Sequence, residues 1–312
     1  MMASFAQPLT FSTRTVGPVA RRHLNDRTQG HIAAVFRSAF YVGTGSHLVC
    51  VGTSALEPGP LNLITSAPAH MDWRASGVRL HGPAAISALE IHVGHRFRFP
   101  LSSAALWSPD PVVEAIDPAA VTLGLAAFRK AFSDQPVEAG ISRFIHPDYA
   151  PEQRHYECQA AQIPIAEARR WLIRAFMHAE TAQSDAPKWI GKLTGLGTGL
   201  TPSGDDFLGG MMIALHCLGY TGIRRSLWRG VRPCAEQTTN AISLALLRAA
   251  SEGLGSASVH KAVSGILQGD IAAVRDAMPG LGRIGHSSGW DAMAGIVTAL
   301  DCWLESQTVS VA

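Results

Sequence analysis

The chain has 312 residues, of which 47% are hydrophobic and 16% are charged, and its formal net charge at pH 7 is +2. A chain of this length and composition is expected to bury a sizeable core in one large domain or two modest ones. It contains no long basic run. This weighs against nucleic acid as the main partner, because proteins that bind the phosphate backbone concentrate Lys and Arg on one face.

The cysteines and the N-terminus favour a cytoplasmic protein with no membrane segment. Five cysteines at irregular spacing, without a C-x-x-C pair, argue against a disulfide framework or a structural zinc site and fit a reducing compartment. The N-terminus lacks the continuous apolar stretch of a secretory signal. The most apolar helix candidate, residues 289–304, is too short to span a bilayer and carries Asp291 and Asp301.

Short runs of Val, Ile, Leu and Phe predict strands between about Gly30 and Leu101. The candidate strand segments are residues 31–43, 47–56, 61–66, 77–82, 88–94 and 97–101. Short strands at near-regular spacing predict a small antiparallel β barrel or sandwich. The turn-rich WSPDP at residues 107–111 marks the boundary, which gives a β-rich domain over residues 1–107 and a helical domain over residues 108–312.

Helical periodicity dominates after this boundary, so the fold class is α+β. Asp117 followed by Pro118 reads as an N-cap with proline in the first helical position. Residues 165–180 form an amphipathic pattern, and residues 239–251, 257–268 and 270–278 predict further helices. The irregular stretch 136–164, which contains several prolines, is read as a long loop.

The motif GLGTGLTPSGDDFLGG, residues 195–210, carries the strongest chemical signal. A glycine-rich loop that leads into a helix is a natural anion site, because unpaired N–H groups point outward there. We expect a ligand to contact this loop and the helix start through Gly197, Gly199, Thr201, Ser203 and Gly204.

Two carboxylates directly behind this loop call for an explanation. Asp205 and Asp206 would repel an anion unless a cation lay between them, but they would accept hydrogen bonds from an amide. The motif therefore suggests a ligand that combines an anionic group with a carbamoyl amide. Ser203 and Asp206 also have capping-box spacing. We thus expect Asp206 to serve both capping and catalysis. Asp205 is expected to be a catalytic loop residue whose substitution leaves stability unchanged.

The motif has an echo, GLGRIGHSSGWD, at residues 280–291. Aligned at Ser203 and Ser288, the two copies match Gly195 with Gly280 and Gly197 with Gly282. The second copy adds His286 as a candidate proton carrier and Ser287, Ser288 and Asp291 as candidate ligand contacts. We predict that the two loops lie together. Thr239, at the start of another helix, is read as its N-cap or as a ligand contact.

Familiar cofactor motifs do not fit this chain. GLGTGL matches neither the dinucleotide fingerprint nor the Walker loop. His92 and His95 are poorly placed to share a metal within a strand. No metal ligand is assigned, and no cofactor is assigned firmly, although Mg²⁺ at the aspartates stays open.

Three stretches, GLGTGLTPSGDDFLGGMMIAL, TTNAISLALLRAASEG and IGHSSGWDAMAGIV, resemble the AllH family. The resemblance is strongest from Leu193 to Val297. It implies a subunit of the oxamate carbamoyltransferase of allantoin and purine breakdown, working with FdrA-like and AllG-like subunits. The implied reaction is phosphorolysis of oxalurate to oxamate and carbamoyl phosphate.

The expected function is therefore that of a subunit of a carbamoyltransferase-like enzyme, with a small anionic or carbamoyl ligand held at paired helix N-termini. Two alternatives remain open. One is a non-catalytic binding or scaffold subunit of a multi-subunit enzyme. The other is a stand-alone Mg²⁺-dependent phosphotransferase.

Overall fold

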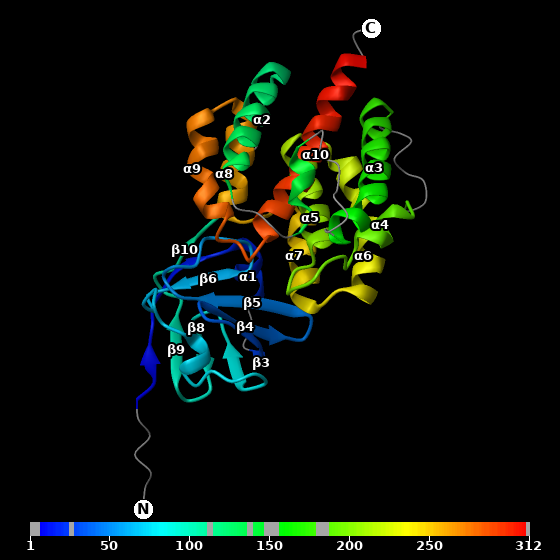
Figure 1. Cartoon of the computed structure of the whole chain (residues 1–312). Helices are drawn as coiled ribbons and strands as arrows, with labels where there is room; N and C mark the ends of the chain where they lie inside the picture. The colour runs from blue at the N-terminus through cyan, green and yellow to red at the C-terminus, as the bar shows by residue number, and fades with distance from the viewer. Residues whose placement is uncertain are drawn as a thin grey trace, which may run out of the picture. The chain divides into compact units, whose positions relative to one another are not determined.

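The computed structural model describes residues 7–24, 28–110, 115–135, 140–146, 156–178 and 187–309. The chain divides into two compact units, Met1–Pro109 and Asp110–Ala312. Each unit has its own apolar core. Figure 1 shows the strands gathered in the first unit and the long helices in the second. The expected fold class, a β-rich N-terminal part followed by a mainly helical part, is confirmed.

The strands of the first unit form one curled sheet in the order β1-β9-β8-β7-β3-β4-β5-β6-β2-β10. Their bounds are β1 Leu9–Thr10, β2 Thr13–Val16, β3 Thr28–Val35, β4 Ala39–Thr44, β5 His47–Gly52, β6 Asn62–Thr65, β7 Pro83–Ile86, β8 Glu90–Val93, β9 Phe97–Pro100 and β10 Ala105–Leu106. Most neighbouring pairs are antiparallel, but β5–β6, β1–β9 and β2–β10 run parallel. A short helix, α1 (Pro18–His23), and a turn of 3-10 helix, η1 (Trp73–Ala75), complete the unit.

Alternation along the strands places one side chain in two in the core. Phe40 and Val42 of β4 pack in the same cluster as Phe99 of β9 and the indole of Trp73. On β8 and β9 the intervening residues are polar, and the Glu90 carboxylate accepts from Arg98 and contacts His92. The strand expected over residues 77–82 is wrong, because this stretch is turns and the strand begins at Pro83.

The second unit contains helices from α2 to α10. Their bounds are α2 Pro118–Ser133, α3 Tyr156–Met177, α4 Trp189–Leu193, α5 Ser203–Cys217, α6 Thr221–Thr238, α7 Ala241–Ser251, α8 Ala257–Gln268, α9 Ile271–Leu281 and α10 Ser288–Val309, with a 3-10 turn η2 at Ser142–Ile145. As expected, Asp117 caps α2 by accepting from the Ala119 N–H at 3.0 Å. The loop expected over residues 136–164 is wrong in its last part, because α3 begins at Tyr156 and contains Pro164. Residues 136–139 and 147–155 of that stretch lie outside the described residues.

Helices α5 and α10 form the centre of this unit and pack more extensively on each other than any other helix pair. Figure 1 shows them between α2, α8 and α9 on one side and α3, α4, α6 and α7 on the other. Both are apolar around most of their circumference, which is the pattern of a buried helix. Among the described residues, no helix is long and apolar enough to cross a membrane.

Candidate functional site at the α5–α10 crossing

The two glycine loops meet where α5 and α10 begin. The hydroxyl groups of Thr201 and Ser288, one from each loop, hydrogen bond at 2.7 Å. The prediction that the loops lie together is therefore confirmed. Their meeting brings the first turns of two long helices to one place.

The repeat is present in the backbone, but in a different register from the expected one. The carbonyl of Leu193 accepts the Leu196 N–H at 2.9 Å, and the carbonyl of Leu196 accepts the Gly204 N–H at 2.9 Å.

The second copy repeats both hydrogen bonds. Leu281 accepts from Ile284 and Ile284 accepts from Gly289, each at 3.2 Å. Leu193 thus corresponds to Leu281, and the second loop is three residues shorter. The alignment of Gly195 with Gly280 is wrong, because Gly280 lies inside α9.

Reciprocal glycines let the two helices cross closely. A Cβ atom on Gly210 of α5 would overlap the carbonyl oxygen of Ala292 on α10. A Cβ atom on Gly295 of α10 would overlap the carbonyl oxygen of Phe207 on α5. Gly210 and Gly295 are 85 residues apart, as are Phe207 and Ala292, which is the offset between Ser203 and Ser288. The crossing is therefore a local two-fold arrangement of two similar segments.

Asp205 is enclosed by donors of its own chain. Its Oδ1 accepts the Gly195 N–H at 2.8 Å, and its Oδ2 accepts the hydroxyls of Thr239 at 2.5 Å and Ser243 at 2.7 Å. The residue lies in the first turn of α5 and is 2% exposed, so the expectation of a loop residue is wrong. Its enclosure by donors leads us to expect that its substitution lowers stability. The Gly195 contact holds the loop to α5, and the Thr239 and Ser243 contacts hold α5 to the start of α7.

The second copy has Trp290 where the first has Asp205. Trp290 is buried and its ring lies 5.4 Å from that of Phe132 on α2. The two copies thus differ at the position where each meets a different neighbouring helix. This explains why an adjacent pair of aspartates occurs only once.

Asp206 and Asp291 occupy the equivalent positions in the first turns of α5 and α10. Burial raises the pKa of Asp206 well above its usual value, and the charge of Asp291 raises it further. The hydroxyls of Thr201 and Ser288 lower that pKa, but burial dominates. Its Oδ2 atom is buried and has no hydrogen-bond partner among the described residues.

Asp291 has the corresponding environment on the other side of the local two-fold arrangement. Burial raises its pKa to about 6, while the hydroxyls of Ser203 and Ser287 lower it. Its Oδ1 accepts the Ile141 N–H at 2.7 Å, and its Oδ2 has no partner among the described residues. Each aspartate therefore lies near the serine that begins the opposite helix.

The capping-box prediction is wrong for α5. The residue before the helix is Pro202, and no side-chain cap is formed there. Thr239 is likewise not the N-cap of α7, because Asn240 accepts from the N–H groups of Ile242 and Ser243. Asp206 does not cap α5 and Thr239 does not cap α7, so both side chains are available for other contacts.

Sequence reasoning missed Gly140 and Glu157. Gly140 has φ +78°, and a Cβ atom there would overlap both oxygens of the Asp291 carboxylate. Glu157 of α3 accepts the N–H groups of Gly140 and Thr198, each at 3.1 Å. Both residues fall in the stretch read as a loop. Neither Gly140 nor Glu157 belongs to a sequence motif that would mark it as a site residue.

The first loop presents unpaired backbone donors. Within the parts of the chain that the structure describes, we find no acceptor for the N–H groups of Gly197, Gly199 and Ser203. Gly197 and Gly199 both have φ +111°, and a Cβ on Gly199 would meet open space. Gly204 is different, because a Cβ there would overlap the Leu193 carbonyl, so this glycine serves packing.

In the second loop His286 is exposed, while Ser287 and Ser288 are half-buried. The described residues include no group of three His, Cys, Asp or Glu side chains close enough to hold a metal ion.

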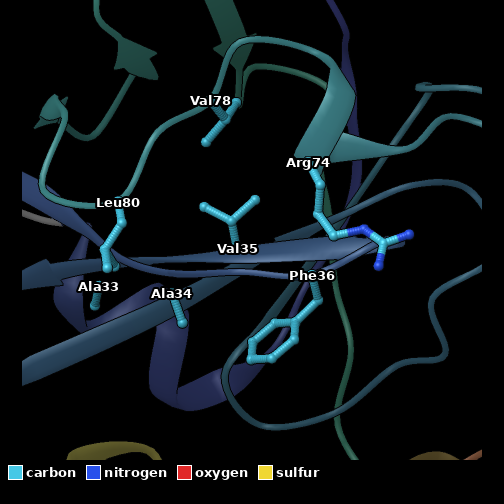
Figure 2. A pocket seen from close by; sticks show the side chains of 7 residues that line it. All are labelled: Ala33, Ala34, Val35, Phe36, Arg74, Val78 and Leu80. Atoms are coloured by element: carbon cyan, nitrogen blue, oxygen red, sulfur yellow. The ribbon is translucent and has the colours of Figure 1, made fainter.

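A shallow hollow of about 430 Å³ lies elsewhere, in the N-terminal unit beside β3. Figure 2 shows the apolar side chains of Val35, Val78 and Leu80 around it. Arg74, at its side, is paired with Asp72. No set of polar groups converges on this hollow, so it offers no chemistry comparable with the α5–α10 crossing.

Residues 193–300 match the family model described as oxamate carbamoyltransferase subunit AllH. This confirms the resemblance over a segment that includes both glycine loops, Asp206 and Asp291. By this likeness the helical unit resembles a subunit of a multi-subunit carbamoyltransferase. No solved structure matches the chain.

Proposed function

We propose that the chain is a subunit of a carbamoyltransferase-type enzyme of purine breakdown and binds a small carbamoyl-bearing anion at the α5–α10 crossing. The observation that carries the proposal is that the AllH match spans both helix N-termini, where unpaired N–H groups lie near two carboxyl groups that each have a buried oxygen. Helix N-termini favour anions, and carboxyl groups pair with amides.

The reaction proposed is oxalurate plus phosphate to oxamate plus carbamoyl phosphate. A phosphate oxygen forms a bond to the carbamoyl carbon, and the bond from that carbon to the nitrogen of the oxamate portion breaks. The proton that hydrogen phosphate brings ends on this nitrogen. Atoms and charge balance without an oxidant or a further reactant.

Each residue has a proposed role in this reading. The N–H groups of Gly197, Gly199 and Ser203 hold the anion. Hydroxyl groups come from Thr201, Ser287 and Ser288. The carboxyl groups of Asp206 and Asp291 face the amide. Asp205 and Thr239 hold the loop in place. Cytoplasmic FdrA-like and AllG-like subunits complete the enzyme.

The test is reconstitution. The chain is purified with FdrA-like and AllG-like partners, and oxalurate phosphorolysis is measured with each subunit omitted in turn. We expect turnover only when this chain is present. Full turnover without it would contradict the proposal. Turnover abolished by a metal chelator and restored by Mg²⁺ would add a cofactor to the proposal. Magnesium-dependent phosphotransfer by the chain alone would replace it.

His286 is proposed as a proton carrier, because it is exposed on the loop that opens α10. A positioned acid or base typically contributes about 10²- to 10⁴-fold in rate. His286→Gln should lower turnover of the reconstituted enzyme within this range and change KM only a few-fold. Unchanged turnover would make His286 a surface residue of the loop.

A scaffold role is the second candidate, and the enclosed carboxylate of Asp205 favours it. That carboxylate accepts from Gly195, Thr239 and Ser243, so the loop is held in place without any ligand. A scaffold would form the complex and bind neither oxalurate nor oxamate. Calorimetry with the isolated chain separates the two candidates.

A further inference from the structure

The arrangement of charge at the crossing conflicts with anion binding unless one carboxyl is neutral. Asp205, Asp206 and Asp291 lie in the first turns of α5 and α10, and Glu157 of α3 contacts the loop through Thr198. The nearby basic residues, Arg283 and His286, are exposed on the second loop. Four ionised carboxylates beside unpaired N–H groups would cancel the attraction that these groups and the helix ends exert on an anion.

The contacts show which carboxyl is neutral. Asp205 accepts from three donors, and Glu157 accepts from two N–H groups. Asp291 accepts one backbone N–H. Both Asp206 and Asp291 have a buried Oδ2 without a partner among the described residues. Asp206 differs in that its donors are only the hydroxyls of Thr201 and Ser288, with no backbone N–H, and the charge of Asp291 lies nearby. Two carboxyl groups in paired environments thus take different protonation states.

We propose that Asp206 is held as a neutral acid at the α5–α10 crossing, and that an oxyanion binds to the N–H groups of Gly197, Gly199 and Ser203 only while it is neutral. The identity of the anion, a carboxylate or phosphate, rests on the proposed function. The dependence of binding on the protonation of Asp206 does not. Ionisation of Asp206 places a charge in the first turn of the helix that receives the anion. Anion affinity therefore falls as pH rises through the pKa of Asp206.

Two probes test the proposal, both measured by calorimetry on the full chain between pH 5 and pH 9. Sulfate remains a dianion throughout this range, so any pH dependence of its binding belongs to the protein. Oxamate, the proposed product, also stays ionised and reports the proposed function. We expect the dissociation constant for sulfate to rise at least about tenfold across this range, since tenfold corresponds to a single unit of pKa coupling.

Asp206→Asn removes the titrating group and keeps its shape. In this variant the rise in the sulfate dissociation constant should be at least about threefold smaller than in the wild type, and the part that remains belongs to Asp291, whose pKa is about 6. Asp276→Asn is the matched control, because it removes the same charge from a side chain that is 70% exposed. It should keep the wild-type pH dependence.

Thr201→Val provides a second variant if Asp206→Asn fails to fold. The Thr201 hydroxyl lowers the pKa of Asp206, so its removal raises that pKa further. The midpoint of the sulfate pH profile should move to higher pH. An unchanged midpoint would contradict the coupling.

The outcomes separate this inference from the proposed function. If sulfate binding weakens as pH rises and oxamate does not bind, the result supports a neutral Asp206 and contradicts the proposed carbamoyltransferase function. Oxalurate turnover by the complex with sulfate affinity independent of pH supports the function and overturns the inference. Absence of sulfate binding at every pH, or a wild-type profile in Asp206→Asn, also overturns it.

Discussion

At the scale of single residues, adjacent aspartates have opposite surroundings. Asp205 meets three donors and Asp206 presents a buried oxygen that meets none among the described residues. Helical geometry turns consecutive side chains about 100° apart, so one faces α7 and the loop while the other faces the α10 crossing. The effects of substituting them should therefore be opposite.

Asp205→Ala should lower the free energy of unfolding by about 3 kcal/mol, because it leaves buried donors without their charged acceptor. Asp205→Asn should cost less, roughly 1–2 kcal/mol, since an amide oxygen still accepts the Gly195 N–H. Denaturant unfolding measures both. A loss below about 0.5 kcal/mol for the alanine variant would show that the loop is not anchored there.

The buried acids at the crossing should make the protein less stable as pH rises. Their pKa values are raised in the folded state, for Asp291 from 3.8 to about 6, so the folded protein binds more protons than the unfolded chain in this window. For Asp291 the stabilisation is complete below about pH 4 and is lost as pH rises through about 6. For Asp291 this corresponds to about 3 kcal/mol.

Other carboxyls titrate in the opposite direction, for example Glu90, whose contacts with His92 and Arg98 lower its pKa. The measurement is therefore the difference in melting temperature between wild type and Asp206→Asn. The variant should become more stable relative to the wild type as pH rises through the pKa of Asp206. A difference that is constant between pH 5 and pH 9 would show that Asp206 does not change its protonation state in this range.

At the scale of elements, the repeated helix–loop–helix segment organises the site. α4 with α5, and α9 with α10, carry equivalent loops and equivalent glycines at the crossing. Backbones that approach this closely leave no room for a methyl group on either side.

Gly210→Ala and Gly295→Ala should each cost about 1–3 kcal/mol or more, because the new Cβ meets a backbone carbonyl that cannot move aside cheaply. Gly222→Ala in α6 is the control, since a Cβ there meets nothing within 4 Å and alanine favours the helix by up to about 1 kcal/mol. Thermal melts compare the three. Equal stability of all three variants would contradict the close crossing.

At the scale of the whole molecule, each unit has a separate apolar core. One core cluster runs from Val16 to Leu101 and the other from Val121 to Trp303, with no residue in common. A unit of this size with its own core is expected to fold alone.

A fragment of residues 110–312 should therefore show a cooperative thermal transition by circular dichroism and keep the helical signal. If the site belongs to this unit alone, the fragment should also keep the sulfate affinity of the full chain. A gradual, non-cooperative melt would mean that the domain boundary predicted near residue 107 does not separate two folding units.

The sequence by itself determined the fold class, the helices with clear periodicity or caps, the glycine–aspartate motif and its echo. These signals are local, since they depend on spacing along the chain and on turn chemistry. It also pointed to the meeting of the two loops, because they share a pattern and two helix N-termini at one place would favour a bound anion. It gave the wrong register for the repeat and placed a loop where α3 begins.

Only the tertiary structure decided the roles of the two aspartates. An aspartate has the same spacing in the sequence whether its side chain faces hydrogen-bond donors or a second carboxyl group. The residues that these side chains contact lie far away in the chain. Asp205 contacts Thr239 and Ser243, while Asp291 contacts Ile141, 150 residues before it. Burial and the distribution of donors set the free energy of each charge, and both are properties of the packed crossing rather than of the motif.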